Sequence, residues 1–421
     1  MPVPTRTEVL VVGAGPTGML AALQLAERGL RVELIEEEWR SAGHSYALAL
    51  HPRSLARLAE VGLAEEAVAA GQKIETLTLF DGPQPRAALR LAPPGARFPF
   101  VLALPQSALE ELLARRLKQK GVSVHWSHRL ASLEPRADTV VARVERLEKV
   151  STGYAVAHTE WAVGKQLEVE ASFVVGTDGH ASLVRRALGL PFDDAGPSQV
   201  FAVLECAAGS PAGELRLVIE TNGTTSVLWP LPGERARWSL EIDAPEVSAE
   251  ERHKSRLTTQ LGERFYHHLD EEVVRALLYE RAPWFSQDAP APGWSIEVRF
   301  ERRLSASFGR GRVWLAGDAA HLTGPAGMQS MNAGLDEASD LAARLERIRG
   351  GNGGLDLLAD YGRERTAEWR FLLGRAGRLR PGPEASEFVA RHTDRLLSCL
   401  PATGDELASL AAQVGLTADR G

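Results

Sequence analysis

Three glycines near the start of the chain, Gly13, Gly15 and Gly18, have the G-x-G-x-x-G spacing that binds pyrophosphate groups. Gly13 permits a tight turn, Gly15 lets the backbone approach the phosphates, and Gly18 allows a helix to pack closely against a strand. Pro16 and Thr17 complete the motif GAGPTG, where the helix begins. The unpaired N–H groups of a helix N-terminus attract an anion, so the motif predicts a dinucleotide site.

A carboxylate follows this motif at the distance that a dinucleotide site requires. Glu36 lies 18 positions after Gly18, at the end of a second apolar stretch. Its side chain is expected to accept hydrogen bonds from a ribose diol. An acid here favours an unphosphorylated ribose, so FAD or NAD is predicted rather than NADP. The alternative interpretation is a βαβ unit that uses its glycines only for turns.

The residues around the motif predict the elements that position it. Residues 9–12 are consecutive apolar residues, mostly β-branched, as in a strand buried on both faces. Residues 19–25 have an apolar helical pattern, and Gly29 suits a C-cap. Residues 32–35 form a second strand that ends at Glu36. This order predicts a βαβ unit in a parallel sheet.

Two aspartates are expected at the same edge of this sheet. The pair Asp178-Gly179 follows the apolar strand 173–176, and the pair Gly317-Asp318 follows the apolar strand 312–316. Ligands of open α/β sheets bind outside the carboxyl ends of the strands. Each aspartate alone is also explained by a turn or a helix N-cap. Together with the glycine motif, they predict a ligand that extends across three strand ends.

Composition and charge restrict the kind of partner. The 421 residues carry a formal net charge of −7 without a basic run, so nucleic-acid binding is not expected. Cys206 and Cys399 lie far apart and are interpreted as buried or incidental thiols in a reducing cytoplasm. We predict no metal site. No stretch approaches the ~20 apolar residues of a membrane-spanning helix.

The intervening segments predict further strands and helices. Segments 139–146, 154–158 and 167–170 are interpreted as three strands of a small antiparallel meander. Residues 248–269 and 271–281 have helical patterns.

Four motifs taken together resemble those of the class A flavoprotein monooxygenases of the para-hydroxybenzoate hydroxylase type. They are GAGPTG with Glu36, PQSALEELL at 105–113, GTDGHASLVRR at 176–186, and RVWLAGDAAH through PAGMQSMN at 312–332. The resemblance covers most of residues 5–350. It implies FAD as the cofactor and NADH or NADPH as a transient reductant.

The resemblance and the element pattern together predict the fold. The expected class is α/β: a Rossmann-like FAD-binding domain with a mixed or parallel sheet, an α+β substrate domain built on an antiparallel sheet, and C-terminal helices. The predicted boundaries are 1–74, 104–190 and 296–349 for the discontinuous FAD-binding domain, 75–103 and 191–295 for the substrate-binding domain, and 350–421 for a C-terminal helical segment.

The resemblance also assigns roles along the cofactor. Glu36 would hold the adenosine ribose, and Gln106 would contact FAD near its pyrophosphate and ribityl chain. The pair Asp178-Gly179 resembles a family motif that serves both FAD and NAD(P)H binding. In the pair Gly317-Asp318, the aspartate would bind a ribityl hydroxyl.

The loop 325–332 is similar to the family's loop beside the isoalloxazine ring, and Pro325, Gly327, Met331 and Asn332 match its pattern. The backbone N–H groups of Met331 and Asn332 would face the pyrimidine oxygen of the flavin, where a helix N-terminus stabilises negative charge. The backbone carbonyl of Pro325 lies by the reactive edge in relatives, which makes Pro325 the candidate catalytic residue.

The chain departs from the family pattern at three positions. Tyr46 stands where many relatives have a basic residue, Ala181 replaces an arginine, and Ser330 replaces a glycine. His321, next to one of the aspartates, is interpreted as a satisfied core histidine. His51 either lies near the flavin or is an ordinary loop residue.

The resemblance implies an FAD-dependent monooxygenase that uses NAD(P)H and O2 and hydroxylates an aromatic or polycyclic small molecule through a flavin C4a-hydroperoxide. Two alternatives stay open: an FAD-dependent oxidoreductase of secondary or isoprenoid metabolism without oxygen insertion, and a non-catalytic FAD-binding protein. The expected partners are the small-molecule substrate and O2, and the chain is expected to be a monomer or a homodimer in the cytoplasm.

Overall fold

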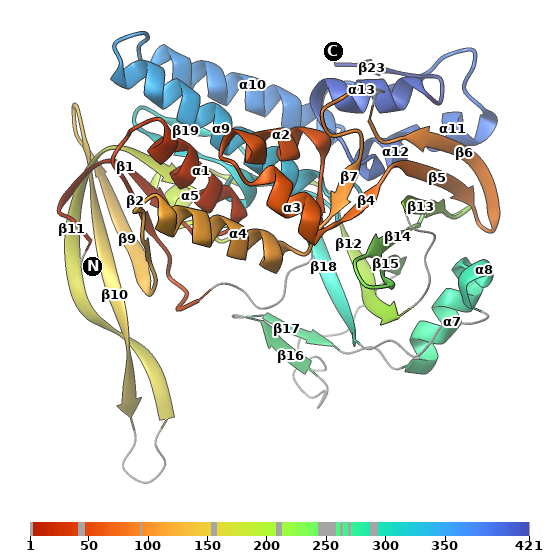
Figure 1. Cartoon of the computed structure of the whole chain (residues 1–421), viewed down its shortest axis with the longest axis horizontal. Coiled ribbons are helices and arrows are strands. Elements are labelled where there is room, and N and C mark those ends of the chain that lie inside the picture. Colours follow the sequence, from red (N-terminus) through yellow and green to blue (C-terminus); the bar gives the residue numbers. More distant parts are fainter. Residues whose placement is uncertain are drawn as a thin grey trace.

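In the computed structural model, two large β-sheets and a set of helices make up the described part of the chain (Figure 1). Within that part, no helix is long and apolar enough to cross a membrane. The described residues are 3–40, 47–92, 95–152, 158–207, 213–242, 258–261, 264–267, 271–286 and 294–420.

The N-terminal segment forms the centre of the first sheet. β1 (Arg6–Val12) pairs in parallel with β2 (Val32–Ile35) on one side and with β11 (His158–Gly176) on the other. Val9 and Leu10 are fully buried, as expected for a strand covered on both faces. The sheet order is β19-β20-β11-β1-β2-β8, which adds β19 (Gly309–Arg310), β20 (Val313–Leu315) and β8 (Val124–His125).

Helices pack on this sheet and on each other. α1 (Pro16–Glu27) contacts both α4 (Gln106–Gln119) and α9 (Gln329–Arg349), so the first and the last helix of the predicted cofactor region are neighbours. α10 (Asp356–Leu372) packs against α9 along the upper edge of the molecule in Figure 1.

The register of the parallel strands brings their carboxyl ends into one row. Val12 is paired with Ile35 on one side and with Gly176 on the other. Gly176 is in turn paired with Leu315 of β20. The sequence prediction that the glycine turn and the two pairs of aspartate and glycine share one edge is therefore confirmed. The residues that follow the four strand ends are Gly13, Glu36, Thr177 and Ala316.

The second sheet has the order β21-β18-β12-β15-β14-β13-β5-β6 and is antiparallel except for one pair. β5 (Thr76–Asp81) and β6 (Gln84–Arg90) join it through the parallel pairing of β5 with β13 (Glu214–Ile219). α7 (Glu271–Arg281) packs on one face against Trp238. The other strands are β12 (Phe192–Ala207), β14 (Thr225–Leu231), β15 (Arg235–Ile242), β18 (Trp294–Ser305) and β21 (His321–Leu322).

Shorter elements complete this architecture. β3 (Ala49–Leu50), β7 (Val101–Ala103) and β4 (Gln72–Ile74) form a small antiparallel sheet. α2 (Pro52–Glu60) and α3 (Ala64–Ala70) follow β3, and α2 packs against α9. The mixed first sheet and the antiparallel second sheet confirm the predicted fold class. The domain boundaries drawn from the sequence remain a prediction.

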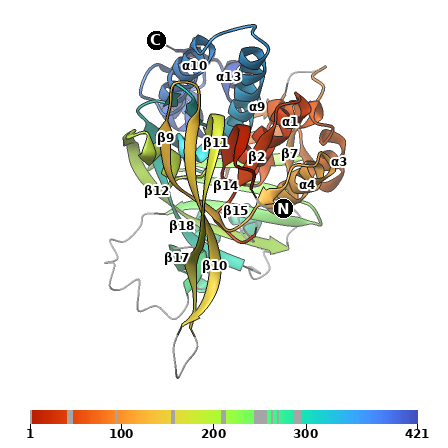
Figure 2. The same ribbon diagram turned by 90° about the vertical axis from the view of Figure 1, so that its left-hand side faces the viewer.

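The predicted meander is wrong, because its strands merge into a long ribbon. β10 (Val140–Thr152) and β11 form an antiparallel ribbon that extends beyond the sheet (Figures 1 and 2), and β9 (His128–Pro135) pairs with the inner part of β10. Residues 167–170 and 173–176 belong to the single strand β11. The polar residues between the predicted strands do not end β11, because hydrogen bonds of its backbone to β10 and β1 continue along it. The remainder of the predicted strand 154–158 lies outside the described residues.

The predicted helix 248–269 is also wrong where the structure describes it. β16 (Thr258–Leu261) and β17 (Arg264–His267) form an antiparallel pair there. Their sequences, TTQL and RFYH, contain β-branched and aromatic residues that favour strands over helices. The rest of this range lies outside the described residues. The helix predicted at 271–281 is confirmed as α7.

The C-terminal segment is helical, as predicted, but it also contains a strand pair. β22 (Arg378–Pro381) pairs antiparallel with β23 (Leu416–Asp419). The pattern did not show this pair because its two short strands are far apart in the chain. The helices between them are α11 (Glu387–Arg391), α12 (Thr393–Cys399) and α13 (Gly404–Ala412).

Candidate cofactor and substrate site

A cavity of about 1090 Å³ lies along the row of strand ends. Its walls come from the start of α1, the segment after β2, the start of α4, the segment after β11, the loop before α9 and β18 of the second sheet. The two large sheets therefore meet at this cavity. The predicted site residues that line it are Gly15, Pro16, Thr17, Gln106, Gly179, Asp318, Pro325 and Met331.

The three glycines of the motif have three different environments. Gly13 has a φ of +102°, and a Cβ there would lie 2.4 Å from the carbonyl oxygen of Thr177. A Cβ on Gly18 would lie 1.9 Å from the carbonyl oxygen of Gly13. A Cβ on Gly15 would meet no atom within 4 Å, so the backbone there faces open space in the cavity. This open position fits a pyrophosphate.

The start of α1 suits an anion. Gly15 is the N-cap, Pro16 is the first residue, and in the described part of the chain no side chain caps this helix. Its first turn contains no acidic residue. The first N–H groups of a helix have no intrahelical partner, so with the open space at Gly15 they fit a phosphate group.

Backbone groups hold Glu36 in place. Its carboxylate accepts hydrogen bonds from the N–H of Ala14 (2.6 Å) and from the N–H of Glu38 (3.0 Å). Burial raises the pKa of Glu36 above its ordinary value. The cavity wall at this point is formed by Glu37 and Glu38. A carboxylate can accept hydrogen bonds beyond these two, so they leave room for a ribose diol. The contact of Glu36 with that diol stays a prediction.

The Asp178 carboxylate faces α5 (Leu183–Ala187). It accepts hydrogen bonds from the hydroxyl of Ser182 (2.6 Å) and from the N–H of Leu183 (2.7 Å), and burial raises its pKa. This is the helix-cap role that the sequence left open. Gly179, with a φ of +72°, lines the cavity and would have space for a ligand beside its Cα. The backbone at Gly179, rather than the aspartate side chain, thus faces the cavity, and binding of the cofactor by this pair stays a prediction.

Gly317 and Asp318 lie at the next strand end, in η1 (Gly317–Ala319). Gly317 has a φ of +64°, and a Cβ on it would lie 2.9 Å from the hydroxyl of Thr17. This strand end is therefore packed directly on the first turn of α1. Asp318 lines the cavity and accepts a hydrogen bond from the hydroxyl of Ser330 (2.6 Å).

Behind Asp318, a chain of polar groups leads from the cavity into the core. The hydroxyl of Ser330 lies 3.4 Å from Nδ1 of His321, and Nε2 of His321 lies 2.9 Å from the carboxylate of Glu337. His321 is fully buried and stacks on Trp369, whose Nε1 donates to Glu337 (2.8 Å). Burial alone would raise the pKa of Glu337, but His321 and these hydrogen bonds lower it. The prediction that His321 is a satisfied core histidine is confirmed.

The loop before α9 presents some residues to the cavity and buries others. Pro325, Met328 and Met331 line the cavity. Met328 is the N-cap of α9 and has a φ of +51°, an uncommon left-handed conformation for a residue other than glycine. Gly327 packs on the C-terminal segment, since a Cβ there would lie 2.7 Å from the carbonyl oxygen of Leu400.

Asn332 is the buried centre of this loop. Its Oδ1 accepts hydrogen bonds from the N–H of His51 (2.7 Å) and from the hydroxyl of Ser54 (2.7 Å). Its Nδ2 donates to the carbonyl groups of Ala49 (2.9 Å) and Met328 (2.7 Å). The side chain therefore shapes the loop, a role that the sequence did not show. The predicted contact of its backbone N–H with the flavin stays a prediction.

His51 fastens the same loop. Its Nε2 lies 3.0 Å from the carbonyl oxygen of Gly327, and because a carbonyl only accepts, this nitrogen carries the proton. Burial lowers the pKa of His51 to about 3. Of the two alternatives for this residue, the structure supports a buried, neutral donor to the loop 325–332.

Gln106 is the first residue of α4 and lines the cavity. Its Nε2 donates to Glu110 (2.7 Å), and burial raises the pKa of that carboxyl group. The contact of Gln106 with FAD stays a prediction. Ala181 also lines the cavity, whereas Tyr46 lies outside the described residues.

Several cavity residues gave no signal in the sequence. Arg299 and Phe300 line the cavity from β18 of the second sheet. No motif marks these two side chains, and only their position in the cavity wall gives them a role. Trp39 and Trp161 also line the cavity, the latter from the β10–β11 ribbon.

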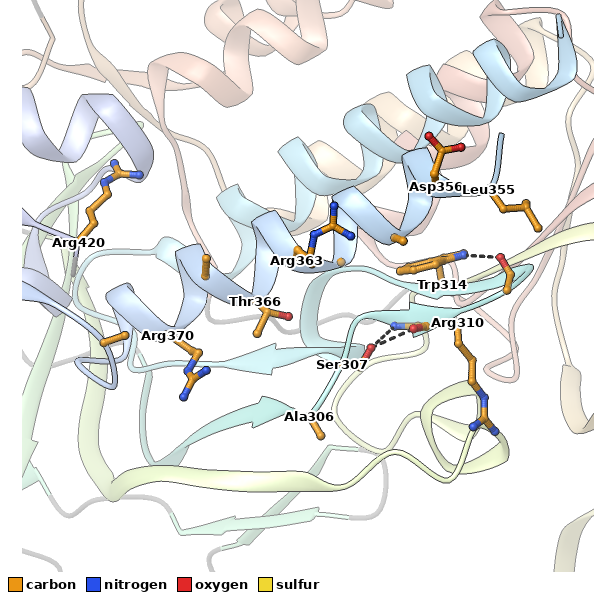
Figure 3. Close-up of a pocket in the computed structure, with 16 residues that line it drawn as sticks. Ala306, Ser307, Arg310, Trp314, Leu355, Asp356, Arg363, Thr366, Arg370 and Arg420 are labelled. Atoms are coloured by element: carbon orange, nitrogen blue, oxygen red, sulfur yellow. Dashed lines mark hydrogen bonds between the residues drawn. The ribbon is translucent and has the colours of Figure 1, made fainter. Parts of the chain in front are cut away.

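A second cavity, of about 850 Å³, lies beside α10 and the β19–β20 hairpin (Figure 3). Arg363 and Arg370 of α10 and Trp314 of β20 form part of its wall. Trp314 Nε1 donates to the carbonyl oxygen of Gly311 (2.9 Å). None of the predicted site residues lies in its walls. The larger cavity is therefore the candidate site.

Comparison with known proteins gives the family. Residues 6–373 match a family model described as FAD binding domain. The 6-methylpretetramide 4-monooxygenase of Streptomyces rimosus is 31% identical over 368 residues, which are 85% of this chain and 59% of that protein. The 3-(3-hydroxy-phenyl)propionate/3-hydroxycinnamic acid hydroxylase of Mycobacterium sp. (strain JLS) is 27% identical, over 88% of this chain and 59% of that protein. The chain thus spans less than two thirds of the length of these relatives.

Solved structures share the fold. The p-nitrophenol 4-monooxygenase PnpA from Pseudomonas putida DLL-E4 has a TM-score of 0.71 at 21% identity, over 97% of this chain and 94% of that chain. The OxyS anhydrotetracycline hydroxylase from Streptomyces rimosus has a TM-score of 0.62 at 27% identity, over 93% of this chain and 69% of that chain. The predicted resemblance and FAD as the cofactor are confirmed. The chain belongs to the FAD-binding domain family of the class A aromatic hydroxylases.

Proposed function

We propose that this chain is an FAD-dependent monooxygenase that uses NADH or NADPH and O2 to hydroxylate an aromatic or polycyclic small molecule. The main supporting observation is that Gly15, Pro325 and Phe300 line the same cavity. A phosphate-binding turn, a flavin loop and a wall of the second sheet would thus enclose the cofactor and a substrate together. Relatives named as monooxygenases and hydroxylases support the same reaction class.

The residues of the first sheet would hold FAD along the strand ends. The backbone at Gly15 and the start of α1 would bind the pyrophosphate, and Glu36 would bind the adenosine ribose. Asp318, oriented by Ser330, would accept a hydrogen bond from a ribityl hydroxyl. When bound, the flavin supplies the electron transfer and the activation of O2.

The part of the wall formed by the second sheet and the start of α9 would position the substrate. Phe300, Leu322 and Met331 give this part of the cavity apolar surfaces, which limit the access of water. A planar aromatic substrate would pack against the ring of Phe300. Arg299, in the same wall, would attract a phenolate or carboxylate group of that substrate. Pro325 would face the reacting carbon with its backbone carbonyl.

The proposal extends to the state of the protein in the cell. We propose a cytoplasmic protein that is a monomer or a homodimer. The two cysteines, free and buried, support a reducing compartment. Size-exclusion chromatography with light scattering would determine the oligomeric state.

The test loads the purified chain with FAD and follows the flavin absorbance under anaerobic conditions with NADH or with NADPH. A panel of phenols and polycyclic aromatics is then added with 18O2. The expected result is faster flavin reduction with a suitable substrate and a product that carries one labelled oxygen atom. Asp318→Ala is expected to reduce FAD loading, whereas Asp356→Ala, in the wall of the second cavity, is expected to leave loading and turnover unchanged.

Other outcomes would contradict the proposal. Flavin reduction without a labelled product would favour the oxidoreductase without oxygen insertion. A yellow protein that neither nicotinamide nucleotide reduces would favour the non-catalytic FAD-binding protein.

A further inference from the structure

Two tryptophans stand beside the acidic segment that follows Glu36. Trp39 and Trp161 line the cavity together with Glu38 and Leu147. Their exposed fractions, 47% and 45%, are high for tryptophan, whose large ring gains much from burial. Neither ring has a role in the binding of cofactor and substrate proposed above. Large exposed aromatic surfaces at a cavity are typical of a contact with a ligand.

The β10–β11 ribbon is shaped to bring Trp161 to this place. The register of the two strands shifts by one residue at Gly164. A β-bulge of this kind changes the face to which the following side chains point. Beyond the bulge, Lys149 is paired with Trp161 and Leu147 with Val163, so the four side chains share one face of the ribbon. The bulge therefore sets which ribbon residues reach the cavity.

The two indole rings border a common space. Nζ of Lys149 lies 4.9 Å from the ring centroid of Trp39 and 5.2 Å from that of Trp161. Both distances are within the range of a cation–π contact. Because one ammonium group contacts both rings, the two indoles lie within reach of a single group in the cavity.

We propose that Trp39 and Trp161 form an aromatic clamp for the adenine ring of FAD. Adenine is flat and aromatic and stacks well on indole rings. The clamp continues the row of cofactor residues past Glu36, where the adenosine ribose is proposed to bind, so this inference rests on the proposed function. The carboxylates of Glu37 and Glu38, in the same wall, would accept hydrogen bonds from the adenine amino group and receive the displaced Lys149.

A comparison of FAD with FMN distinguishes the clamp from the rest of the site. FMN carries the flavin, the ribityl chain and one phosphate but no adenosine. The full chain is loaded with either flavin and diluted, and the released flavin is measured by its fluorescence. Trp39→Ala and Trp161→Ala are each expected to raise the Kd of FAD about tenfold, the effect of one lost stacking contact, and to leave the Kd of FMN unchanged. Trp161→Phe is expected to restore most of the affinity. Val163→Ala, on the same ribbon face but outside the cavity wall, is the matched control.

Several results would overturn this assignment. Normal FAD affinity of both alanine variants would show that the rings do not bind adenine. An equal loss of FAD and FMN affinity would indicate a general defect of the site. A raised Kd for NADH with an unchanged Kd for FAD would mean that the clamp binds the adenine of the reductant instead. If the wild-type chain binds neither flavin, the proposed function itself is wrong.

Discussion

Two of the helix N-termini in the cavity walls, those of α1 and α9, are built in different ways. α1 begins at Gly15 and α9 begins at Met328, and in the described structure neither has a side-chain cap. The start of α1 is shaped mainly by its nearest neighbours in the chain, since Gly13 makes the turn and Gly18 permits close packing. The start of α9 is shaped by residues from distant parts of the chain.

Side chains of α9 make these distant contacts. Asn332 bonds to groups of residues 49–54, and Nε2 of Gln329 donates to the carbonyl groups of Leu397 (2.9 Å) and Leu400 (3.2 Å). A substitution at Gly15 would therefore act directly on a bound phosphate, whereas a substitution at Asn332 would act through the packing of the loop. We therefore expect a substitution at Gly15 to lower cofactor affinity and a substitution at Asn332 to lower stability.

The largest expected effect tests the glycine turn. A methyl group added at Gly18 would lie 1.9 Å from the carbonyl oxygen of Gly13, so Gly18→Ala is expected to lower the free energy of unfolding by about 3 kcal/mol. A methyl group added at Gly15 would meet no protein atom, so Gly15→Ala is expected to keep the stability of the flavin-free chain. It should weaken FAD binding about tenfold, or ~1.4 kcal/mol, because the methyl group enters the phosphate space.

Urea unfolding and flavin release would measure these two effects. Normal FAD affinity of the Gly15→Ala variant would show that no phosphate approaches the backbone there. A Gly18→Ala variant as stable as the wild type would mean that α1 can move away from β1 at little cost.

An effect of similar size tests the start of α9. Asn332→Ala would leave two donors and two acceptors of a buried loop without their partner, so it is expected to cost about 3 kcal/mol of unfolding free energy. Ser330→Ala is the matched control in the same helix, because it removes one bond to Asp318 and a long contact of 3.4 Å with His321, and it should cost about 1 kcal/mol. Equal losses for the two variants in urea unfolding would contradict the central role of Asn332.

The sequence was sufficient to predict the first of these regions. The residues that predicted the glycine turn lie within 9–36, so local pattern alone placed the strand, the turn and the helix. Asp178 shows the limit of such reasoning. Its position after a strand suits both a ligand contact and a helix cap, and only the hydrogen bonds to α5 show that the side chain caps the helix.

The second region could not be predicted from pattern, because its partners are distant in the chain. The sequence shows that Asn332 and His51 exist, but their contact depends on the packing of α2 against α9. The β10–β11 ribbon is a similar case. The outer parts of β10 and β11 are strands because their backbones pair with each other. The prediction of separate short strands within 139–170 therefore missed both the length of the ribbon and the position of Trp161.

A smaller effect, of pH, should appear at the start of α9. Burial lowers the pKa of His51 from 6.5 to about 3, so between these values the unfolded chain binds a proton that the folded chain does not. The contribution of His51 to stability is complete above pH 6.5 and is lost as the pH falls, by up to about 1.4 kcal/mol per pH unit. Urea unfolding of the wild type should show this loss between neutral pH and about pH 5, and His51→Asn should show a smaller slope. Equal slopes would mean that the folded ring accepts the proton.

The smallest effect is the reaction of the two thiols with a disulfide reagent. It shows which part of the structure unfolds locally. Cys206 and Cys399 are free and buried, which confirms that they do not form a disulfide, and burial raises their pKa values to about 11 and about 12. Because the thiolate is the reactive form, neither should react with a disulfide reagent in the folded wild type, and both should react in denaturant. Cys399 lies behind the loop before α9, where a Cβ on Gly327 would approach its backbone to 3.3 Å, whereas Cys206 lies in β12. In the Asn332→Ala variant, Cys399 should therefore be labelled before Cys206. Equal rates would show that this variant opens the whole chain rather than the α9 loop, and the contrast between the two helix starts would be lost.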